Sequence, residues 1–507
     1  MNDMMTLNDL FSAGPDSANA LGAPGSYDLT YAGLRQLVHE TRLSLNAVGM
    51  GRNDRIAIVL PNGPLMASSF ISIASCATSA PLNPAYRADE FEFYLSDLNA
   101  KALWVEAGSD SPAISVARKL GIAIIHVQGT PELAAGTFTL DVSSLSGNCA
   151  QPGIALADDV ALILHTSGTT SRPKIVPLTQ RNVCASARNI AQTTQFTKDD
   201  RGLNIMPLFH IHGLIAGVLA PLSRGGSVFC TSGFNALKFF SWMDEAKPSW
   251  YTAVPTMHQT IAARAAHNAG TIARNPLRFV RSSSSSLAPQ LLAELESTFQ
   301  TPVIEAYGMT EAAHQMACNP LPPGLRKPGS VGLAAGPEMA IMDDEGTLLA
   351  CGAIGEIVIR GDNVTPGYEN NDKANAEAFT KGWFRTGDQG VMDAAGYIAL
   401  TGRLKEIINR GGEKISPREV DEVLLDHAAV AQVVTFGIPH DKLGEEVAAV
   451  VVLREGHVAT EREIRDFAMQ KLADYKVPKK VIFMDELPKG ATGKLQRIGL
   501  AKKLGLA

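Results

Sequence analysis

The feature that most constrains the fold is a strand that runs directly into a loop of small hydroxyl residues. Val160–Leu164 is a short apolar run, which predicts a buried strand. His165–Lys174, with the sequence HTSGTTSRPK, then supplies hydroxyls, a glycine and two cations. Backbone amides, hydroxyls and a lysine ammonium can together surround phosphate oxygens. A surface loop without a ligand has a similar composition, so the rest of the chain has to decide between the two interpretations.

This loop differs from the Walker phosphate-binding loop. The pattern Gly-x-x-x-x-Gly-Lys-Ser/Thr is absent, and Pro173 disfavours a helix at Arg172, two residues before Lys174. A phosphate site here would therefore be of a different kind.

Predicted strands and helices alternate through most of the chain. The spacing of apolar residues predicts helices over Tyr31–Met50, Leu65–Ala77, Ala88–Leu98 and Pro289–Phe299. Short apolar runs predict strands at Arg55–Leu60, Ala102–Val105, Ile122–Val127, Ser227–Cys230, Trp250–Val254 and Phe279–Arg281. Strands separated by helices favour an α/β fold in which helices cover mostly parallel sheets.

The pattern changes after about residue 330. Three β-rich pieces at Met339–Met342, Gly355–Arg360 and Gly396–Leu400 are separated by turn residues and suggest a small antiparallel, barrel-like subdomain. The last hundred or so residues alternate helix and strand and could fold as a compact α+β unit. We expect a domain boundary between residues 401 and 402, which gives domains 1–401 and 402–507.

Composition excludes several classes of protein. The net charge of −6 leaves no basic footprint for nucleic acid. The six cysteines are scattered without a metal-binding pattern, which fits a reducing compartment. The N-terminus has no signal-peptide pattern, and no apolar stretch of about 18 residues occurs that could span a membrane. We therefore expect a cytoplasmic protein without a membrane span.

Two further segments suggest a ligand pocket. Ser282–Ser286 follows a predicted strand and precedes a predicted helix, and ligands commonly bind at such junctions in α/β sheets. Val303–Glu311 is a strand that ends in an aromatic, a hydroxyl and a carboxylate. Tyr307 alone could be a core residue and Glu311 alone a solvated charge, but together they form a plausible stacking face and metal ligand.

Six motifs, in order and at matching spacing, resemble those of the adenylate-forming superfamily of acyl-CoA synthetases, a group that includes 4-coumarate–CoA ligases and luciferases. The motifs are Thr166–Lys174, Pro207–Gly213, Tyr307–Glu311, Trp383–Asp388, Gly402–Arg410 and Pro488–Lys494. The resemblance covers nearly the whole chain. It implies a large N-terminal AMP-binding domain and a small mobile C-terminal domain, with ATP, Mg2+ and coenzyme A as cofactor and co-substrates.

The resemblance also implies roles for single residues. The β- and γ-phosphates of ATP would be held by Thr166, Ser167, Gly168, Thr169, Thr170 and Lys174. The adenine would stack on Tyr307, next to Gly308, and its other side would be lined by Ser284, Ser285 and Ser286. Thr310 would donate to the α-phosphate and Glu311 would hold Mg2+. Asp388 and Arg403 would bind the ribose hydroxyls.

The implied reaction has two halves, adenylation of a carboxylate and transfer of the acyl group to a thiol. Lys494 resembles the lysine that bridges the carboxylate and the α-phosphate, where negative charge accumulates. The thiol needs a channel in the same place, so the C-terminal domain would rotate about a hinge at Lys405. Gly411 and Gly412 would let the backbone approach the pantetheine arm of CoA.

The phosphate loop departs from the family pattern at two positions. The family usually has glycine where Ser171 and Ile175 stand here. A β-branched residue tolerates a positive φ poorly, so at Ile175 either the backbone is extended or the loop is strained.

The acyl pocket carries polar side chains where relatives that use fatty or aromatic acids are usually apolar. His212, Ser284 and His314 would line it, and His210 would be catalytic, or else would gate the pocket or pack. Imidazoles around a hydrocarbon would remain unpaired at a cost of about 1–3 kcal/mol each. The Tyr307–His314 and Ser282–Pro289 segments resemble oxalate–CoA ligases of plants and yeasts. We expect oxalate as the substrate, and other short dicarboxylates such as malonate are the next candidates.

Other functions remain open at the level of sequence. The enzyme alternatives are a medium-chain or aromatic (4-coumarate-like) acyl-CoA ligase and an adenylation module that loads a carrier protein. A non-catalytic AMP-binding relative is the alternative from another class. Retention of Lys174, Glu311, Asp388, Arg403 and Lys494 argues against a loss of catalysis. The oligomeric state is left open between monomer and homodimer.

Overall fold

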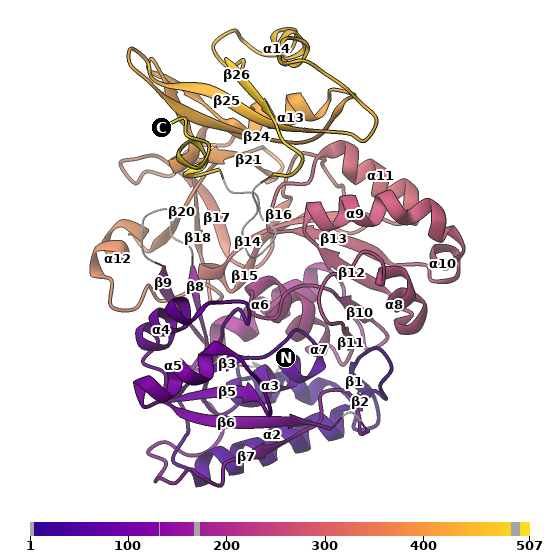
Figure 1. The fold of residues 1–507 in the computed structure, drawn as a ribbon, viewed down its shortest axis with the longest axis vertical. Coiled ribbons are helices and arrows are strands. Elements are labelled where there is room, and N and C mark those ends of the chain that lie inside the picture. The colour runs from indigo at the N-terminus through magenta and orange to yellow at the C-terminus, as the bar shows by residue number, and fades with distance from the viewer. Residues whose placement is uncertain (1–4, 131, 167–172, 488–496) are drawn as a thin grey trace.

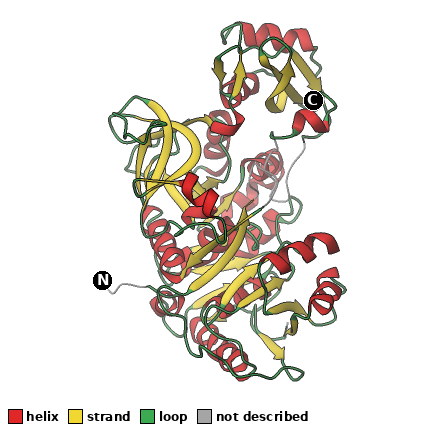
Figure 2. Cartoon of the chain, turned by 90° about the vertical axis from the view of Figure 1, so that its left-hand side faces the viewer, coloured by secondary structure: helices red, strands yellow, loops and turns green. Residues whose placement is uncertain are grey.

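The computed structural model describes residues 5–130, 132–166, 173–487 and 497–507. Three sheets form the N-terminal part, and a fourth forms a smaller unit at one end of the molecule, which carries the C-terminus (Figure 1). Seen from the side, the strands of the third sheet curve strongly beside this unit (Figure 2). The predicted α/β class with a small second domain is therefore confirmed.

The first sheet carries the phosphate-loop motif at its edge. Its order is β7-β6-β5-β3-β4-β8-β9. The strands are β3 (Arg55–Val59), β4 (Thr78–Pro81), β5 (Ala102–Glu106), β6 (Ala123–Gly129), β7 (Phe138–Asp141), β8 (Val160–Thr166) and β9 (Lys174–Thr179). β3, β4, β5, β6 and β8 pair in parallel, whereas β7 and β9 are antiparallel edge strands. The edge position of β9 tolerates Pro177, which lacks an amide hydrogen.

The second sheet has the order β16-β15-β14-β13-β12-β10-β11-β1-β2. Its strands are β1 (Asn19–Gly22), β2 (Leu29–Thr30), β10 (Arg201–Asn204), β11 (Ser227–Cys230), β12 (Trp250–Ala253), β13 (Phe279–Ser283), β14 (Val303–Met309), β15 (His314–Cys318) and β16 (Leu333–Ala334). The six strands from β1 to β14 in this order are parallel. Their carboxyl ends meet at one edge, where ligands of open α/β sheets bind.

The third and fourth sheets are smaller and mostly antiparallel. The third contains β17 (Glu338–Met342), β18 (Ile354–Arg360), β19 (Phe379–Thr380), β20 (Trp383–Met392) and β21 (Ile398–Arg403). The fourth contains β22 (Ile408–Arg410), β23 (Glu413–Ile415), β24 (Val430–His440), β25 (Gly444–Leu453) and β26 (Lys480–Phe483). The predicted boundary at residues 401 and 402 falls within β21, and the fourth sheet begins five residues after its end.

Helices cover both large sheets. The longer ones are α2 (Tyr31–Ala47), α3 (Pro64–Ala74), α4 (Ala88–Asp97), α5 (Pro112–Leu120), α6 (Gln180–Thr193), α8 (Phe239–Ala246), α9 (Pro255–Ala265), α11 (Pro289–Phe299), α12 (Asp372–Ala378), α13 (Pro417–Leu425) and α14 (Glu461–Met469). Helix α3 packs on β3 and β11, and α6 on β8 and β15, so both lie between the two large sheets and share one core. Threonine caps at Thr30, Thr179 and Thr460 fix where three helices begin.

The shortest elements complete the chain. They are α1 (Leu7–Leu10), η1 (Phe11–Ala13), η2 (His212–Leu219), α7 (Ala220–Leu222), η3 (Ala266–Asn268), α10 (Ala269–Arg274), η4 (Thr310–Ala312), η5 (Leu404–Glu406) and α15 (Leu500–Lys503). In the described part of the chain, every helix is too short or too polar to span a bilayer.

Candidate active site

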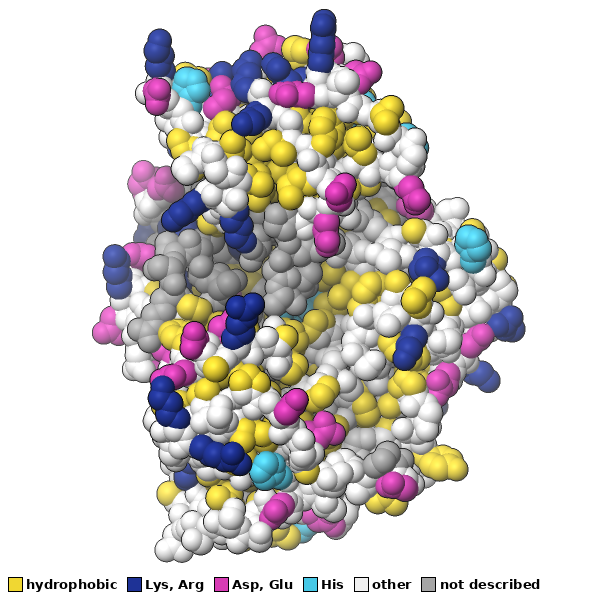
Figure 3. All heavy atoms as spheres, viewed as in Figure 1, with side chains coloured by type: hydrophobic (Ala, Val, Ile, Leu, Met, Phe, Trp, Pro, Cys, Tyr) yellow, Lys and Arg dark blue, Asp and Glu magenta, His cyan; other side chains and the backbone are white. Residues whose placement is uncertain are grey.

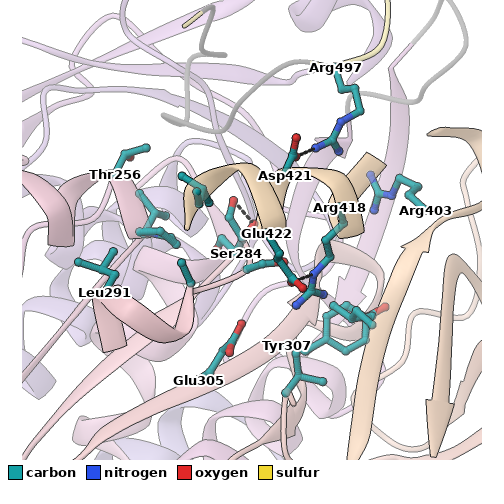
Figure 4. Close-up of a pocket in the computed structure, with 18 of the residues that line it drawn as sticks. Thr256, Ser284, Leu291, Glu305, Tyr307, Arg403, Arg418, Asp421, Glu422 and Arg497 are labelled. Atoms are coloured by element: carbon teal, nitrogen blue, oxygen red, sulfur yellow. Dashed lines mark hydrogen bonds and ion pairs between the residues drawn. The ribbon is translucent and has the colours of Figure 1, made fainter. Parts of the chain in front are cut away.

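A cavity of about 360 Å³ lies where the second sheet, the third sheet and the C-terminal unit meet (Figure 4). Its lining includes the predicted nucleotide-binding residues Ser284, Ser285, Ser286, Tyr307, Gly308, Asp388 and Arg403. The serines follow β13 and Tyr307 lies near the end of β14, so neighbouring parallel strands bring them together. Asp388 and Arg403 come from the paired strands β20 and β21 of the third sheet.

One chain of contacts joins Tyr307 to the two residues predicted to bind the ribose. The Tyr307 hydroxyl donates to Asp388 Oδ2 at 2.5 Å, and Arg403 Nε donates to Asp388 Oδ1 at 2.8 Å. Burial, reinforced by the Asp388 carboxylate, raises the pKa of Tyr307 well above its usual value, so its hydroxyl remains a donor. The Asp388 charge raises the pKa of Arg403. The carboxylate is thereby fixed in orientation at the cavity wall.

The phosphate-loop residues that the structure describes lie on the β8–β9 hairpin. Thr166, the last residue of β8, pairs with Lys174, the first residue of β9. Ile175 is an extended strand residue, so the departure from the family pattern at this position causes no strain, whereas the departure at Ser171 lies outside the described residues. Ser167, Gly168, Thr169 and Thr170 lie outside the described residues, as does Lys494.

Lys174 and Glu311, which belong to two separate motifs, both contact Tyr368, a residue that the sequence analysis did not identify. Lys174 Nζ lies 4.0 Å from the ring centre of Tyr368, and the Tyr368 hydroxyl donates to Glu311 Oε1 at 2.8 Å. Thr310 and Glu311 form a short 3-10 turn after β14. Burial lowers the pKa of Lys174, although Glu311 opposes this shift.

Glu311 has the properties of a cation ligand. Its carboxylate is buried, and burial raises its pKa. A buried carboxylate that accepts one hydroxyl hydrogen bond retains lone pairs for a hard cation such as Mg2+. Among the described residues no group of three metal-binding side chains surrounds it, so phosphate oxygens and water would have to complete the coordination.

The three predicted acyl-pocket residues form one buried cluster. His212 Nδ1 lies 3.1 Å from Ser284 Oγ, and His212 Nε2 lies 2.7 Å from the hydroxyl of Thr252. The His314 ring stacks on the His212 ring, with centroids 4.8 Å apart and an interplanar angle of 18°. Ser284 also lines the cavity, so this cluster continues from the cavity wall.

A buried arginine completes the cluster. Arg281 Nη2 lies 3.1 Å from His314 Nε2 and donates to Gln315 Oε1 at 3.1 Å. Sequence reasoning did not assign either residue. The sequence feature that could have identified Arg281 is its charge within the buried strand Phe279–Ser283, where a hydrophobic side chain is expected.

The backbone of this cluster is held in unusual conformations. Ser284 has a φ of 74° and His314 a φ of 101°, in the left-handed region that non-glycine residues rarely adopt. Such conformations persist where the surrounding structure holds them, commonly at functional sites. Gly308 is required beside them, because a Cβ atom there would lie 1.8 Å from the backbone oxygen of His314.

The remaining predicted residues lie outside this cluster. His210 precedes the π-helix η2, is half-buried, and its carbonyl accepts from the Leu214 amide. Lys405 lies in η5, between the third and fourth sheets. Gly411 and Gly412 form the β22–β23 turn with φ values of 62° and 95°, which glycine adopts without strain.

Comparison with known proteins places this site in a family. The sequence model of the AMP-binding enzyme family matches residues 13–369, and that of the AMP-binding enzyme C-terminal domain matches residues 419–494. The chain belongs to the AMP-binding enzyme family. The CoA ligases of this family take a carboxylate, ATP and CoA as substrates.

Individual members of this AMP-binding enzyme family match over nearly the full chain. An oxalate–CoA ligase of Arabidopsis thaliana is 47% identical over 94% of this chain and 94% of its own length. An oxalate–CoA ligase of Saccharomyces cerevisiae is 43% identical over 89% of this chain and 87% of its own. ATP-bound MatB from Rhodopseudomonas palustris is 28% identical, with a TM-score of 0.88 and 99% coverage of both chains. The expected resemblance to oxalate–CoA ligases is confirmed.

Proposed function

We propose that this chain is an oxalate–CoA ligase, which converts oxalate, ATP and CoA to oxalyl-CoA, AMP and diphosphate through an oxalyl-adenylate. The observation that carries this proposal is the buried cluster of His212, Ser284 and His314 at the cavity wall. A hydrocarbon tail would offer no acceptor to the Ser284 hydroxyl, and an unsatisfied buried polar group costs about 1–3 kcal/mol. The distal carboxylate of oxalate would accept a hydrogen bond from Ser284, which lines the cavity and contacts His212.

In the adenylation half, the cavity would hold the nucleotide. Tyr307 and the serines after β13 would flank the adenine, and Asp388, fixed by Tyr307 and Arg403, would accept from the ribose hydroxyls. Thr166, Lys174 and the residues 167–170 would hold the β- and γ-phosphates. Thr310 would donate to the α-phosphate, and Glu311 would hold Mg2+, which would neutralise phosphate charge.

The energy barrier of the adenylation half comes from the negative charge that develops in its transition state. The oxalate oxygen attacks the α-phosphorus, and negative charge accumulates between the two groups. A flexible, singly charged lysine side chain can reach both, which is the role proposed for Lys494. His210, on the loop before η2, would be catalytic at the carboxylate end or gate the entry of the acid.

In the thioester half, the C-terminal unit would rotate about Lys405 so that Gly411 and Gly412 face the pantetheine arm. Hydrophobic side chains gather on the side of this unit that faces the N-terminal part (Figure 3). An apolar surface makes no directional contacts, so sliding along it breaks few hydrogen bonds. All six cysteines are free thiols, which supports the cytoplasmic location proposed for the enzyme.

The test of this function is ATP–pyrophosphate exchange across oxalate, malonate, acetate, octanoate and 4-coumarate, followed by CoA-dependent AMP release with the best acid. We expect oxalate to give the highest kcat/KM and octanoate and 4-coumarate to give none above background. A preference for octanoate or 4-coumarate would remove oxalate as the substrate. Absence of exchange with every acid would favour a non-catalytic relative.

A further inference from the structure

The side chain of Arg281 is the largest buried charge beside the acyl cluster. It lies on β13 with 0% of its surface exposed. Its contacts in the described part of the chain are His314 Nε2 at 3.1 Å, Gln315 Oε1 at 3.1 Å and, more weakly, His212 Nε2 at 3.4 Å. None of these groups is a carboxylate, and Arg281 Nε has no hydrogen-bond partner among the described residues.

A guanidinium in this position keeps its charge. Burial lowers the pKa of Arg281 to about 10, so the group is still protonated at pH 7. A buried charge without a counter-charge is costly, and a protein retains one where a ligand or another group compensates it. The cluster therefore holds one positive charge more than the described side chains neutralise.

The contacts also place the hydrogens on both imidazole rings. Arginine has only donors, so an imidazole nitrogen that bonds to it must be the acceptor and carries no hydrogen. Arg281 lies 3.1 Å from His314 Nε2 and 3.4 Å from His212 Nε2, and the Thr252 hydroxyl, 2.7 Å from His212 Nε2, then also donates to this nitrogen. In a neutral ring the hydrogen is then on Nδ1.

The position of the hydrogen on the His212 ring determines whether Ser284 presents a hydrogen-bond donor or an acceptor to the cavity. The Nδ1–H of His212 donates to Ser284 Oγ, and the serine hydroxyl is then free to donate onward into the cavity that it lines. The opposite tautomer would make Ser284 donate to His212 and would present an oxygen lone pair to the substrate. A carboxylate is recognised by the first arrangement and repelled by the second.

Resting on the proposed function, we infer that Arg281 is a positioning residue for the acid. It fixes His212 and His314 as Nδ1–H tautomers and supplies the buried positive charge that selects an acid with a second carboxylate. Among the described residues Arg281 is not one that lines the cavity, so it acts through the rings. The ligand class that this arrangement favours is a short dianion over a neutral analogue of the same shape.

Oxamate provides the matched probe, because it has the shape of oxalate but an uncharged amide at the distal end. The experiment measures kcat/KM for ATP–pyrophosphate exchange with both acids in the wild-type enzyme, Arg281→Gln and Arg281→Lys. We expect the ratio of kcat/KM for oxalate to kcat/KM for oxamate to fall roughly 10- to 100-fold in Arg281→Gln, mainly because KM for oxalate rises. Lysine retains the charge but cannot contact both rings, so this ratio should fall less in Arg281→Lys than in Arg281→Gln.

Arg278→Gln is the matched control. Arg278 lies three residues earlier, is half-buried, and pairs with Asp200 at 3.0 Å, away from the cavity. Its loss should leave the oxalate-to-oxamate ratio unchanged. If the wild-type enzyme gives no exchange with oxalate, the proposed function fails; if it does and the ratio is the same in Arg281→Gln, only the role of Arg281 fails.

A second measurement tests the positioning itself. Nitrogen-15 NMR of histidine-labelled wild-type enzyme, assigned with His212→Gln and His314→Gln, reports which ring nitrogen carries hydrogen. We expect Nδ1–H on both rings at pH 7, and a mixture of tautomers in Arg281→Gln. An Nε2–H or doubly protonated ring in the wild-type enzyme overturns the inference. This wild-type spectrum decides the matter even if Arg281→Gln does not fold.

Discussion

At the scale of single residues, Tyr368 links two motifs that are far apart in the sequence. Its hydroxyl donates to Glu311 and its ring lies under Lys174. Tyr368→Phe keeps the ring and removes the hydroxyl. The hydroxyl lowers the pKa of Glu311 against the effect of burial, so its loss leaves a carboxylate that holds its proton to higher pH.

We expect Tyr368→Phe to need roughly 10-fold more Mg2+ for half-maximal adenylation, since partners of metal ligands typically contribute about 10- to 100-fold to metal affinity or activity. The acid limb of its pH–rate profile should move to higher pH, because only the deprotonated carboxylate binds the cation. Magnesium titrations of ATP–pyrophosphate exchange between pH 5 and pH 9 measure both effects. Tyr397→Phe, which removes a hydroxyl bound to the Leu325 carbonyl, should show neither.

Glu305 is a second buried carboxylate and lies on β14. Its Oε1 accepts a hydrogen bond from the Leu287 amide at 3.0 Å. Burial raises its pKa from 4.5 to about 7. The folded protein therefore binds this proton more tightly than the unfolded chain. Between pH 4.5 and pH 7 the folded state holds more of it, so this group makes stability decrease as the pH rises.

Glu305→Gln keeps an oxygen for the Leu287 amide and removes the ionisation. We expect the variant to match the wild-type protein near pH 4.5 and to exceed its stability by about 2–3 kcal/mol above pH 7. Thermal unfolding midpoints at pH 5, 6, 7 and 8 measure the difference. A constant difference across this range would contradict the assigned cause. Glu296→Gln, on the half-exposed end of α11, serves as the charge-loss control.

At the scale of elements, the β14–β15 hairpin brings His314 to the site. Its strands pair Gly308 with Gln315 and Met309 with His314, around an irregularity in the register. A Cβ atom at position 308 would lie 1.8 Å from the His314 carbonyl oxygen, which is backbone and cannot turn aside. Gly308→Ala must therefore displace the segment that carries the histidine.

We expect Gly308→Ala to reduce kcat/KM for adenylation roughly 100-fold, because a displacement of about 1 Å at a reacting group can cost this much. Thermal stability should fall by about 1–3 kcal/mol, as for other overpacked sites. ATP–pyrophosphate exchange and the unfolding midpoint measure these effects. Gly270→Ala, on helix α10 with an Arg274 nitrogen 3.4 Å from the new Cβ, should change neither measurably.

Sequence patterns predicted those elements whose local signals agree with their burial. The helix Pro289–Phe299 and the strand Ser227–Cys230 have the predicted bounds. Each has proline or turn residues at its start and a clear apolar face. Because the family motifs are local, the residues proposed to bind the nucleotide, after β13 and at the end of β14, could be named from the sequence, and the structure places them around one cavity.

Other elements depend on contacts that local patterns do not contain. β4 (Thr78–Pro81) directly follows the predicted helix Leu65–Ala77 and was not predicted, because its small residues have no strand signal of their own. The π-helix that begins at His212 is stabilised by packing between the sheets, not by propensity. Arg281 and Tyr368 escaped prediction for the same reason: their roles depend on partners brought together only by the tertiary fold.

At the scale of the whole molecule, Arg497 joins the segment that directly follows the predicted hinge to the body of the C-terminal unit, and it lines the cavity between this unit and the N-terminal part. It donates to Asp421 of α13 (Figure 4), to Glu406 of η5 at 2.6 Å, and from Nε to the Thr435 carbonyl at 2.6 Å. Burial raises the pKa of Asp421 to about 6, while Arg497 opposes this shift. The Gln290 side chain of α11 donates to Asp426 and so joins the N-terminal part to the C-terminal unit.

The contact between Gln290 and Asp426 and the place of Arg497 in the cavity wall belong to one orientation of the C-terminal unit, and the proposed reaction uses two orientations. If this orientation serves adenylation, Arg497→Met should weaken adenylation and spare the other half. Removal of one partner from a buried ion pair costs about 3–5 kcal/mol, so a loss of roughly 100-fold or more in ATP–pyrophosphate exchange is expected. Lys494→Ala should have the same selectivity and a larger effect, because it removes the proposed catalytic charge.

The measurement separates the halves by supplying oxalyl-adenylate with CoA and following oxalyl-CoA, beside ATP–pyrophosphate exchange with oxalate. Arg462→Met, on the exposed face of α14, is the control and should change neither rate. Equal loss of both rates in Arg497→Met and Lys494→Ala would mean that one orientation serves both halves. Selective loss of adenylation in both variants is expected only if the C-terminal unit leaves this orientation before the thiol attacks.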